Sequence, residues 1–357
     1  MKIFKSYCRI IYYFRFYMKL TFSPHTLYFK RPFKIAHGTR SSTPIVLTQL
    51  EHEGIIGYGE ASLPPYLSES HQTVLEFLNR ATPIIKILQN PVDIEFVLNE
   101  IDKIAPNNIA AKASIDIALH DLVGKLKNEP CWKHFSCIKG NTPFTTYTLG
   151  IDEPEIIKLK IKEGEEYKYF KVKLNGENDK QIINTIREVT DKPIAIDVNQ
   201  GWRDKYIALE MINWLSDKNV LFIEQPLQKD NYEDSHWLFE RSPLPIFADE
   251  SIQRYSDIDY AKNCFHGINI KLMKCTGMFE AHKMIKRARE LNLKLLIGCM
   301  SETSCAISAA AQLTPLVDYA DLDGALLIKN NLFKGVDFYE GKIILNEMPG
   351  IGAVPVS

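Results

Sequence analysis

Short apolar segments recur at nearly constant spacing through the second half of the chain, and each carries one charged or small residue near its end. Counted from Lys173, these marker residues follow one another at steps of 22 to 27 residues. A strand, a helix and two connecting loops need about that length, so the pattern predicts repeated βα units that close into a barrel. The markers are Lys173, Asp197, Glu224, Asp249, Lys271, Gly298 and Asp321.

An eighth strand is expected just before these segments, where the chain reads TTYTLG at residues 145–150. After Asp323 the sequence shows irregular and strand-like stretches but no clear eighth helix. The predicted fold is therefore α/β, a (β/α)7β TIM-like barrel. Helices are expected between its strands, for example at residues 180–190, 205–217, 278–291 and 303–313.

The first third of the chain has a different pattern, in which strands are followed by helices. A hairpin is expected around the turn at Glu53 and Gly54, between the segments IVLTQLEHE and IIGYGEAS. Helical periodicity follows at residues 70–88, 92–104 and 108–126, and the last of these has one continuous apolar face. This order predicts an N-terminal α+β capping domain. The expected division is residues 18–130 for this domain, 140–330 for the barrel, and 331–357 for a C-terminal segment that returns to the capping domain.

The composition is that of an ordinary globular protein, with 45% hydrophobic and 24% charged residues. The net charge of −1 gives no electrostatic reason to expect nucleic acid or an anionic membrane as a partner. Seven cysteines occur without a CxxC pair or a Cys/His cluster, so we expect reduced thiols in a cytoplasmic protein. The sequence leaves open whether the chain forms a homo-oligomer.

Residues 1–17 are basic and aromatic and need a separate interpretation. Arg9 and Arg15 interrupt the apolar run that a signal peptide would require, and no small-residue cleavage site follows. The segment also lacks the run of about 20 apolar residues that a transmembrane helix needs. We expect the fold to begin near Met18, with the preceding residues an extension or the product of an upstream start.

Two lysines lie close together in the segment YFKVKLN. Because side chains two residues apart point to the same face of a strand, Lys171 and Lys173 are expected to be neighbours inside the barrel. Adjacent ammonium groups disfavour each other's charge, which lowers a lysine pKa toward that of a usable base. A solvent-facing pair is the alternative, but a closed barrel has no edge strand on which such a pair would lie.

Three acids, Asp197, Glu224 and Asp249, end successive strands and are expected to converge at the C-terminal rim of the barrel. Converging carboxylates repel one another unless a cation lies among them. Oxygen ligands without histidine or thiolate favour Mg²⁺, with Mn²⁺ as the alternative. Asn199 and Glu250 are candidates for the polar groups that orient these ligands.

A third lysine, Lys271, ends a strand across the barrel from Lys171 and Lys173. Lysines on two faces of a metal-held substrate suit 1,1-proton transfer, in which one removes a proton and the other returns it. The metal stabilises the enediolate that forms when a carbon next to a carboxylate loses its proton. Lys274 lies beyond the strand end, and we expect it to be a solvated charge.

The last strand ends in Asp321-Leu322-Asp323, which adds two carboxylates outside the metal set. Their partner must be positively charged. An α-ammonium group of the substrate is one candidate, and an ion pair with a neighbouring lysine or arginine is the other.

The motifs KVK, DVNQGW, IEQP, ADES and NIKLMKCTG, in this order and at this spacing, resemble those of the enolase superfamily in its muconate-lactonizing subgroup. GYGEAS and AAKASIDIALHDLVGK are similar to the capping-domain signatures of the same group. The resemblance runs from about Met18 to the C-terminus. The final DLD, after GCMSETSCAISAAAQ, is similar to that of the dipeptide epimerases, best known as L-Ala-D/L-Glu epimerases.

The resemblance implies a role for each matching residue. Lys173 and Lys271 would be the two acid/base catalysts, and Lys171 would help to bind the substrate carboxylate. Asp321 and Asp323 would hold the amino terminus of a dipeptide. The implied Mg²⁺ ligands are Asp197, Glu224 and Asp249. The other positions that match substrate contacts are Thr148, Cys299, Met300 and Ser301.

The sequence departs from the resemblance at the pocket for the substrate's side chain. Family members that act on Ala-Glu can carry an arginine on the loop after a PFK-like segment, where Gly38 stands here and Arg40 follows two residues later. Arg40 would pair with a glutamate side chain if the loop allows it; otherwise the pocket would prefer an uncharged side chain. We expect Mg²⁺-dependent epimerisation at the Cα of a dipeptide's C-terminal residue, with L-Ala-D/L-Glu as the substrate. The resemblance implies that this dipeptide arises from peptidoglycan turnover.

The alternatives differ in what the site would bind. o-Succinylbenzoate synthesis or N-acylamino-acid racemisation would keep the fold and the metal, but those substrates carry no free ammonium for Asp321 and Asp323. A Schiff-base lysine enzyme would need no cluster of three acids. A barrel that keeps a metal site without catalysis would be expected to lack a lysine or a metal ligand, and none is missing.

Overall fold

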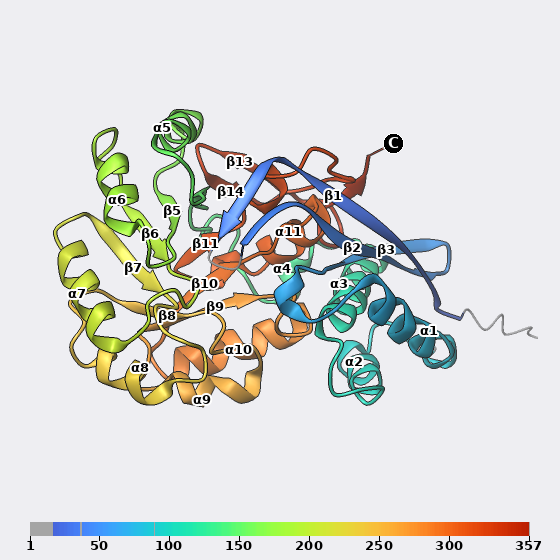
Figure 1. Cartoon of the computed structure of the whole chain (residues 1–357). Coiled ribbons are helices and arrows are strands. Elements are labelled where there is room, and N and C mark those ends of the chain that lie inside the picture. Colours follow the sequence, from blue (N-terminus) through green and yellow to red (C-terminus); the bar gives the residue numbers. More distant parts are fainter. Residues whose placement is uncertain (1–16, 36–37, 89, 357) are drawn as a thin grey trace, which may run out of the picture.

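The computed structural model describes residues 17–35, 38–88 and 90–356, so that nearly all of the basic N-terminal extension lies outside the described residues. A barrel and a smaller capping domain lie side by side, with the first strands and helices of the chain on one flank of the barrel (Figure 1). This arrangement confirms the predicted fold class.

The capping domain is built on a three-stranded antiparallel sheet in the order β1-β2-β3. The hairpin between β2 and β3 turns where it was predicted, with Glu53 at φ 53° and Gly54 at φ 78°. The strands are β1 (Lys19–Ile35), β2 (Gly38–His52) and β3 (Ile55–Ser62). The helices that follow are α1 (His71–Ile87), α2 (Ile94–Asp102), α3 (Ile109–Leu126) and the short α4 (Cys131–His134).

Eight parallel strands form the barrel, and each pairs with its neighbour in chain order. A bridge between Thr145, two residues before the first strand, and Ala320 of the last strand closes the ring. The strands are β4 (Tyr147–Leu149), β5 (Phe170–Lys173), β6 (Ile194–Asp197), β7 (Val220–Glu224), β8 (Ile246–Ala248), β9 (Gly267–Lys271), β10 (Lys294–Gly298) and β11 (Tyr319–Asp321).

One helix follows each strand of the barrel except the last, among the described residues. The expected helix bounds differ from the observed ones by at most three residues. The helices are α5 (Pro154–Glu163), α6 (Asp179–Arg187), α7 (Lys205–Leu215), α8 (Tyr232–Phe239), α9 (Ile258–Ala261), α10 (Met278–Glu290) and α11 (Ser304–Ala311).

The pairing register brings the marker residues to one level of the barrel. Lys173 pairs with Asp197, and Asp197 pairs with Glu224. On the other side, Gly298 of β10 pairs with both Lys271 and Asp321. Since parallel strands point the same way, these strand ends meet at one rim.

Helix α3 packs between the capping sheet and the barrel. It approaches β3 closely because Gly59 has no side chain: a Cβ there would lie 1.9 Å from the carbonyl oxygen of Ser114. On the opposite side, the Asp116 carboxylate accepts a hydrogen bond from the backbone N–H of Met278, at the start of α10 (2.5 Å). The helix is therefore buried on nearly all sides and not on one face alone.

The chain beyond the barrel forms short strand pairs that touch the capping domain. The ring centroids of Tyr58 and Phe333 lie 5.5 Å apart, and the Asp121 carboxylate accepts a hydrogen bond from the backbone N–H of Ile351 (2.9 Å). The pairs are β12 (Phe333–Lys334) with β15 (Val354–Pro355), and β13 (Asp337–Tyr339) with β14 (Lys342–Ile344). These contacts agree with the expected return of residues 331–357, while the proposed domain bounds stay a prediction.

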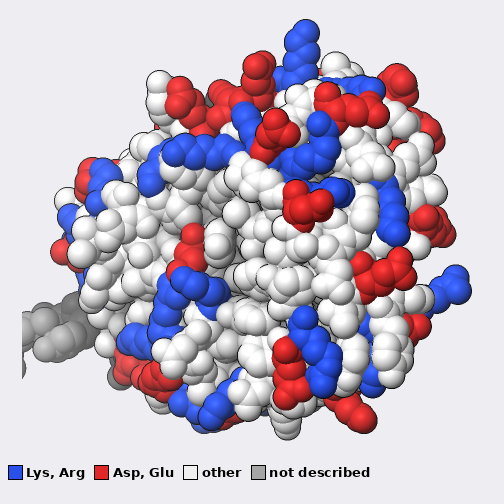
Figure 2. Space-filling model, turned by 90° about the vertical axis from the view of Figure 1, so that its left-hand side faces the viewer, with Lys and Arg blue, Asp and Glu red and all other residues white. Residues whose placement is uncertain are grey.

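The distribution of charged side chains on the surface and the state of the described cysteines agree with what the composition predicts. On the face drawn in Figure 2, basic and acidic side chains are interspersed and form no broad patch of one sign. The six described cysteines form no disulfide. None of the helices in the described part of the chain combines the length and the apolar character needed to span a membrane.

Candidate active site

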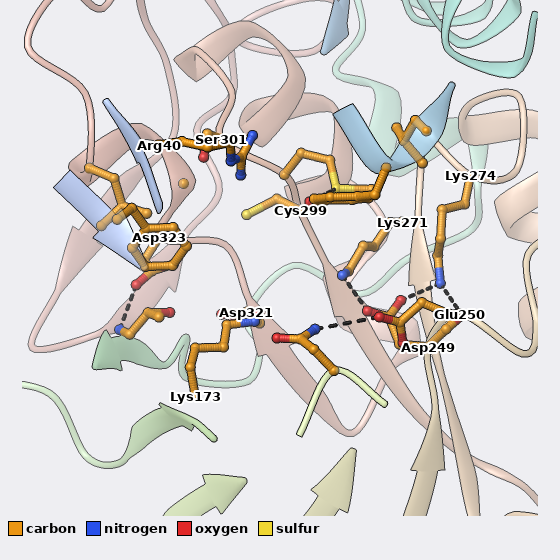
Figure 3. Close-up of a pocket in the computed structure, with 18 of the residues that line it drawn as sticks. Arg40, Lys173, Asp249, Glu250, Lys271, Lys274, Cys299, Ser301, Asp321 and Asp323 are labelled. Atoms are coloured by element: carbon orange, nitrogen blue, oxygen red, sulfur yellow. Dashed lines mark hydrogen bonds and ion pairs between the residues drawn. The ribbon is translucent and has the colours of Figure 1, made fainter. Parts of the chain in front are cut away.

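A cavity of about 180 Å³ opens at the C-terminal rim of the barrel, under residues contributed by the capping domain (Figure 3). Its walls include both predicted catalytic lysines, Lys173 and Lys271, and the predicted metal ligand Asp249. The predicted substrate positions that line it are Arg40, Thr148, Cys299, Met300, Ser301, Asp321 and Asp323.

The three predicted metal ligands converge as expected. Asp197 and Glu224 end β6 and β7, and Asp249 directly follows β8. All three are buried, and one oxygen from each lies within 4.8 Å of those from the others. Glu224 Oε2 is buried 2.8 Å from Lys171 Nζ without a hydrogen bond of proper geometry. Three buried carboxylates with spare lone pairs fit a hard divalent cation such as Mg²⁺.

Lysine ammonium groups alternate with these carboxylates. Lys173 Nζ lies 2.5 Å from Asp197 Oδ2, and Lys271 Nζ lies 2.6 Å from Asp249 Oδ2. Lys171 Nζ lies between carboxylates, 2.8 Å from Glu224 and 3.3 Å from Asp197. The charges of the buried acids are therefore largely compensated within the site.

The pKa values of the acids follow their lysine neighbours. Burial alone would raise the pKa of Asp197, but the Lys173 and Lys171 ammonium groups bring it down to about 2. The pKa of Asp249 is also lowered, because Lys271 and Lys274 outweigh its burial. Burial and the neighbouring Asp197 charge raise the pKa of Glu224 to about 7. Two of the three carboxylates are thus strongly held in the charged form.

The expectation of a lowered pKa is wrong for Lys171. Burial acts in that direction, but the carboxylates of Asp321, Glu224 and Asp197 outweigh it and raise the pKa of Lys171 well above its usual value. These three carboxylates lie within 3.3 Å of the Lys171 ammonium group, so their attraction for its charge outweighs the effect of burial. Lys171 is also absent from the described lining of the cavity, so its predicted contact with a substrate carboxylate stays a prediction.

The expectation that Lys274 is a solvated charge is wrong as well. Its side chain is 4% exposed, and its ammonium group donates to Asp249 Oδ1 and to the Asp249 carbonyl oxygen (2.5 Å). The turn after β9 folds back toward the rim, which carries Lys274 inward.

Lys173 and Lys271 lie on opposite sides of the cavity. They end β5 and β9, which are separated by three strands in the order of the sheet. In a ring of eight strands this places them across the barrel from each other, as Figure 3 shows. A substrate carbon held between them would face one amine on each side.

The last strand presents its two acids to the same cavity, from the side opposite Asp249 (Figure 3). Asp321 accepts hydrogen bonds from Lys171 Nζ (2.7 Å) and Thr146 Oγ1 (2.6 Å). Asp323 accepts one from the backbone N–H of Thr148 (2.7 Å). Burial, together with the Asp321 charge, raises the pKa of Asp323 to about 7.

Arg40 reaches the cavity from β2 of the capping domain. Its guanidinium carbon lies 5.7 Å from the Phe29 ring centroid and 5.6 Å from that of Tyr66. Its Nη1 atom is buried without a hydrogen-bond partner, and no carboxylate of the described chain forms an ion pair with it. A ligand carboxylate would supply the missing acceptor.

Sequence reasoning did not find several groups that support the site. Asn269, two residues before Lys271, donates a hydrogen bond to Glu224 Oε1 (2.7 Å). The side chain of Gln225 accepts from the backbone N–H of Asp249 (3.0 Å). Asn269 lies on the same face of β9 as Lys271, so the two-residue period of a strand could have predicted its position from the sequence.

Further groups lie in loops, where no period applies. Tyr66, in the short 3₁₀ turn Pro65–Leu67, donates a hydrogen bond to Met300 Sδ (3.3 Å) and lines the cavity. Of the two predicted supporting groups, Asn199 donates its backbone N–H to Asp197 Oδ1 (3.0 Å), and its amide lies 3.5 Å from Glu250 Oε1.

A capped eight-stranded barrel with three buried acids at its rim, between lysines on opposite sides, defines a class of enzyme with a candidate site for a divalent cation. The chain belongs to the mandelate racemase/muconate lactonizing enzyme family of the enolase superfamily. The N-terminal domain of that family matches residues 19–135, and the enolase C-terminal domain-like family matches residues 155–356.

Individual relatives cover nearly the whole chain. An L-Ala-D/L-Glu epimerase from Bacteroides thetaiotaomicron is 50% identical over 340 residues, 95% of this chain and 88% of that protein. An N-succinyl-L-Arg/Lys racemase from Bacillus cereus is 31% identical, covering 90% of this chain and 91% of that protein. A solved dipeptide epimerase from Enterococcus faecalis, complexed with Mg and L-Leu-L-Tyr, matches with a TM-score of 0.88, 31% identity, and coverage of 95% and 99%.

Proposed function

We propose that the protein is a dipeptide epimerase that inverts the Cα of the C-terminal residue by proton transfer between Lys173 and Lys271. The observation that carries this proposal is their placement on strands across the barrel, with both side chains lining one cavity. One amine would remove the α-proton from one face, and the ammonium group of the other would return a proton to the opposite face.

Asp197, Glu224 and Asp249 would hold a Mg²⁺ ion. When bound, the ion would supply positive charge that stabilises the negative charge developing on the substrate carboxylate as the α-proton leaves. The same carboxylates also position the two lysines: Asp197 holds the Nζ atom of Lys173, and Asp249 that of Lys271, at hydrogen-bond distance.

The amino end of the substrate would lie at β11. Asp323 is a buried carboxylate that forms no ion pair with a cation of the described chain, and its cavity position suits an α-ammonium group. A free amine is what separates a dipeptide from an N-acylated amino acid.

L-Ala-D/L-Glu is the dipeptide that the site fits best. The Arg40 guanidinium lies over the rings of Phe29 and Tyr66 and has a buried N–H without an acceptor. Arginine binds carboxylates in a bidentate fashion, so a glutamate side chain would satisfy it, whereas an apolar side chain would leave it unpaired. The similarity to the Bacteroides L-Ala-D/L-Glu epimerase supports the same choice.

A second candidate, racemisation of N-succinylated amino acids, is favoured by the similarity to the Bacillus cereus racemase. Such a substrate would place an acyl group near Asp323 and Asp321. The buried Asp323 carboxylate, which forms no ion pair within the described chain, would then meet no cation from the substrate, and this is the reason to prefer the dipeptide.

Proton NMR in D₂O tests the proposal. Wild-type protein with Mg²⁺ is incubated with L-Ala-L-Glu, L-Ala-L-Leu and N-succinyl-L-Arg, and loss of the α-proton signal is followed. We expect exchange at the C-terminal residue of the dipeptides, fastest for glutamate, and little for the N-acyl compound. Arg40→Met should remove the preference for glutamate over leucine. Protein inert to every free-amino dipeptide would refute the proposal.

The two lysines are tested separately with each of the two epimers of the dipeptide, which differ at the Cα of the C-terminal residue. Lys173→Ala should abolish α-proton exchange from one epimer and Lys271→Ala from the other, because each amine faces one side of Cα. Intact exchange of both epimers in either variant would contradict the assignment.

A further inference from the structure

A buried aspartate of the capping domain holds the start of a barrel helix. Asp116 lies on α3 and is 1% exposed, and its carboxylate accepts hydrogen bonds from the backbone N–H groups of Met278 (2.5 Å) and Phe279 (3.1 Å). These are two of the N–H groups that the first turn of α10 leaves without a partner inside the helix. A carboxylate at this end of a helix also interacts favourably with the helix dipole. Asp116 thus caps a helix that begins 162 residues further along the chain.

The carboxylate fits closely against the residues around it. Gly277, just before α10, has φ 117°, and a Cβ there would lie 2.3 Å from the carboxyl carbon of Asp116. On its own helix, His120 Nδ1 lies 3.3 Å from Asp116 Oδ1. Because the carboxylate is fixed from both directions, the position of the N-terminus of α10 depends on α3.

The turn that leads into α10 begins at a predicted catalytic lysine. Lys271 ends β9, and residues 272–277 alone separate it from α10. Backbone hydrogen bonds hold this turn together, from Lys274 N–H to the Lys271 carbonyl oxygen (2.9 Å) and from Gly277 N–H to that of Leu272 (3.1 Å). A short turn bonded in this way transmits a displacement at one end to the other. The position of Lys271 therefore depends on where α10 begins.

The other predicted base is anchored within the barrel. The turn after Lys173 leads to α6, and Asp179 at the start of that helix accepts hydrogen bonds from the backbone N–H groups of Asn175 (3.2 Å) and Gly176 (3.0 Å). Asp179 also accepts one from Trp202 Nε1 (2.7 Å). All these groups belong to the barrel, so the two lysines differ in what fixes their turns.

We propose that Asp116 is a positioning residue for Lys271. Through α10 and the turn at residues 272–277, the capping domain would fix the amine on one side of the substrate carbon and not the amine of Lys173 on the other. The inference rests on the proposed function and deepens it, because it gives the capping domain a part in proton transfer. Asp116 acts from a distance, since it does not line the cavity of the described chain.

Two buried aspartates of α3 offer a matched pair of variants. Asp121 is 0% exposed and also accepts two backbone N–H groups, from Tyr58 (2.8 Å) and Ile351 (2.9 Å), but these belong to β3 and to the C-terminal segment. Asp116→Asn and Asp121→Asn should both lower stability to urea, because each removes a buried charge to which backbone groups donate. Only Asp116→Asn should displace the turn at Lys271.

Exchange of the α-proton in D₂O, at saturating Mg²⁺ and dipeptide, measures the two sides of the site separately. The epimer that still exchanges in Lys173→Ala identifies the side that Lys271 serves. On that side Asp116→Asn should slow exchange by about tenfold or more, since a misplacement of about 1 Å can cost about 100-fold. Exchange of the other epimer should stay within about twofold of wild type, as should the ratio of the two rates in Asp121→Asn.

Amide hydrogen exchange on the Mg²⁺-free protein tests the geometry without turnover. Asp116→Asn should lose protection over residues 272–279, and Asp121→Asn should keep the wild-type pattern there. His120→Phe is the second variant: it keeps a ring against Phe135 (centroids 5.4 Å apart) and removes the N–H beside Asp116. It should change the ratio of the two exchange rates in the same direction as Asp116→Asn, by less, and it carries the test if Asp116→Asn does not fold.

The outcomes separate this inference from the function on which it rests. A wild-type protein inert to every free-amino dipeptide would refute the proposed function, and the inference with it. An active wild type in which Asp116→Asn slows both epimers equally, or neither, would overturn only the role of Asp116. A change of ratio as large in Asp121→Asn, or unchanged protection over residues 272–279 in both Asp116→Asn and His120→Phe, would overturn that role as well.

Discussion

The Lys274 ammonium group ties two strand ends together at the rim. Besides the Asp249 carboxylate and carbonyl, it donates to the carbonyl oxygens of Ile252 (3.3 Å) and Asn269 (3.1 Å). Asp249 thus has Lys274 on one carboxylate oxygen and Lys271 on the other. The orientation of this predicted metal ligand depends on a residue that lies outside the cluster of acids.

Lys274→Met should destabilise the protein and weaken Mg²⁺ binding. Breaking a buried pair leaves an uncompensated carboxylate and several carbonyls without donors, so we expect the free energy of unfolding to fall by about 3 kcal/mol. Mg²⁺ affinity should fall by about tenfold or more, as for other groups that orient metal ligands. Urea unfolding and calorimetry measure the two effects. Lys286→Met, at an exposed position of α10, is the control; equal behaviour of both variants would contradict the assignment.

Lysines show how far sequence reasoning extends at the scale of single residues. Lys173 and Lys271 were correctly expected at the rim because both end strands, where the two-residue period fixes the direction of a side chain. Lys274 lies in the turn after β9, where no such period exists, and it was wrongly expected in solvent. The partners of Lys171 also depend on strands at distant chain positions, which no local pattern predicts.

At the scale of elements, the buried carboxylate of Glu60 helps to join the capping domain to the barrel. Glu60 of β3 accepts hydrogen bonds from both the backbone N–H of Thr303 (2.9 Å) and its hydroxyl, just before α11. The same loop carries Met300, whose backbone N–H donates to Glu302 (3.0 Å). Burial raises the pKa of Glu60 to about 7, and burial with the Glu60 charge raises that of Glu302 to about 8.

Glu60 should make stability depend on pH. Because its pKa in the folded protein exceeds the usual 4.5, the native state binds more protons than the unfolded state between these values. Its contribution is therefore complete below pH 4.5 and is lost as the pH rises through about 7, with a slope of at most about 1.4 kcal/mol per pH unit. Glu60→Gln should lack this slope.

Urea unfolding from pH 5 to pH 8 measures the difference between wild type and Glu60→Gln. The variant should gain stability relative to wild type as the pH rises. Glu95→Gln, at an exposed position of α2, should follow the wild-type curve. Parallel curves for wild type and Glu60→Gln would show that Glu60 is not the group that titrates.

Element boundaries were predictable to within a few residues, but contacts between elements were not. The periodicity of residues 108–126 gave α3 correctly, since helical spacing is a local property. That α3 is buried on almost all sides follows from two partners far away in the chain, the capping sheet and α10. The contact of Glu60 with Thr303 likewise spans 243 residues.

At the scale of the whole molecule, the rim gathers charge from nearly every barrel strand. Five buried acids, Asp197, Glu224, Asp249, Asp321 and Asp323, face the ammonium groups of Lys171, Lys173, Lys271 and Lys274. In the unfolded chain these groups are dispersed and hydrated. Their convergence is a property of the closed barrel alone, so a cation that binds them binds the native state and not the unfolded chain.

Mg²⁺ should therefore raise the melting temperature of the wild-type protein in a saturable manner. A ligand at 100 times its dissociation constant adds about 2.7 kcal/mol to native-state stability when it does not bind the unfolded chain. Differential scanning calorimetry with increasing MgCl₂ measures the effect, with KCl at matched ionic strength to separate screening from binding. Glu224→Gln, which removes one ligand charge and keeps its shape, should shift saturation to higher Mg²⁺ concentrations. An equal rise in KCl, or an unchanged curve in Glu224→Gln, would mean that the stabilising cation binds elsewhere than among the three acids.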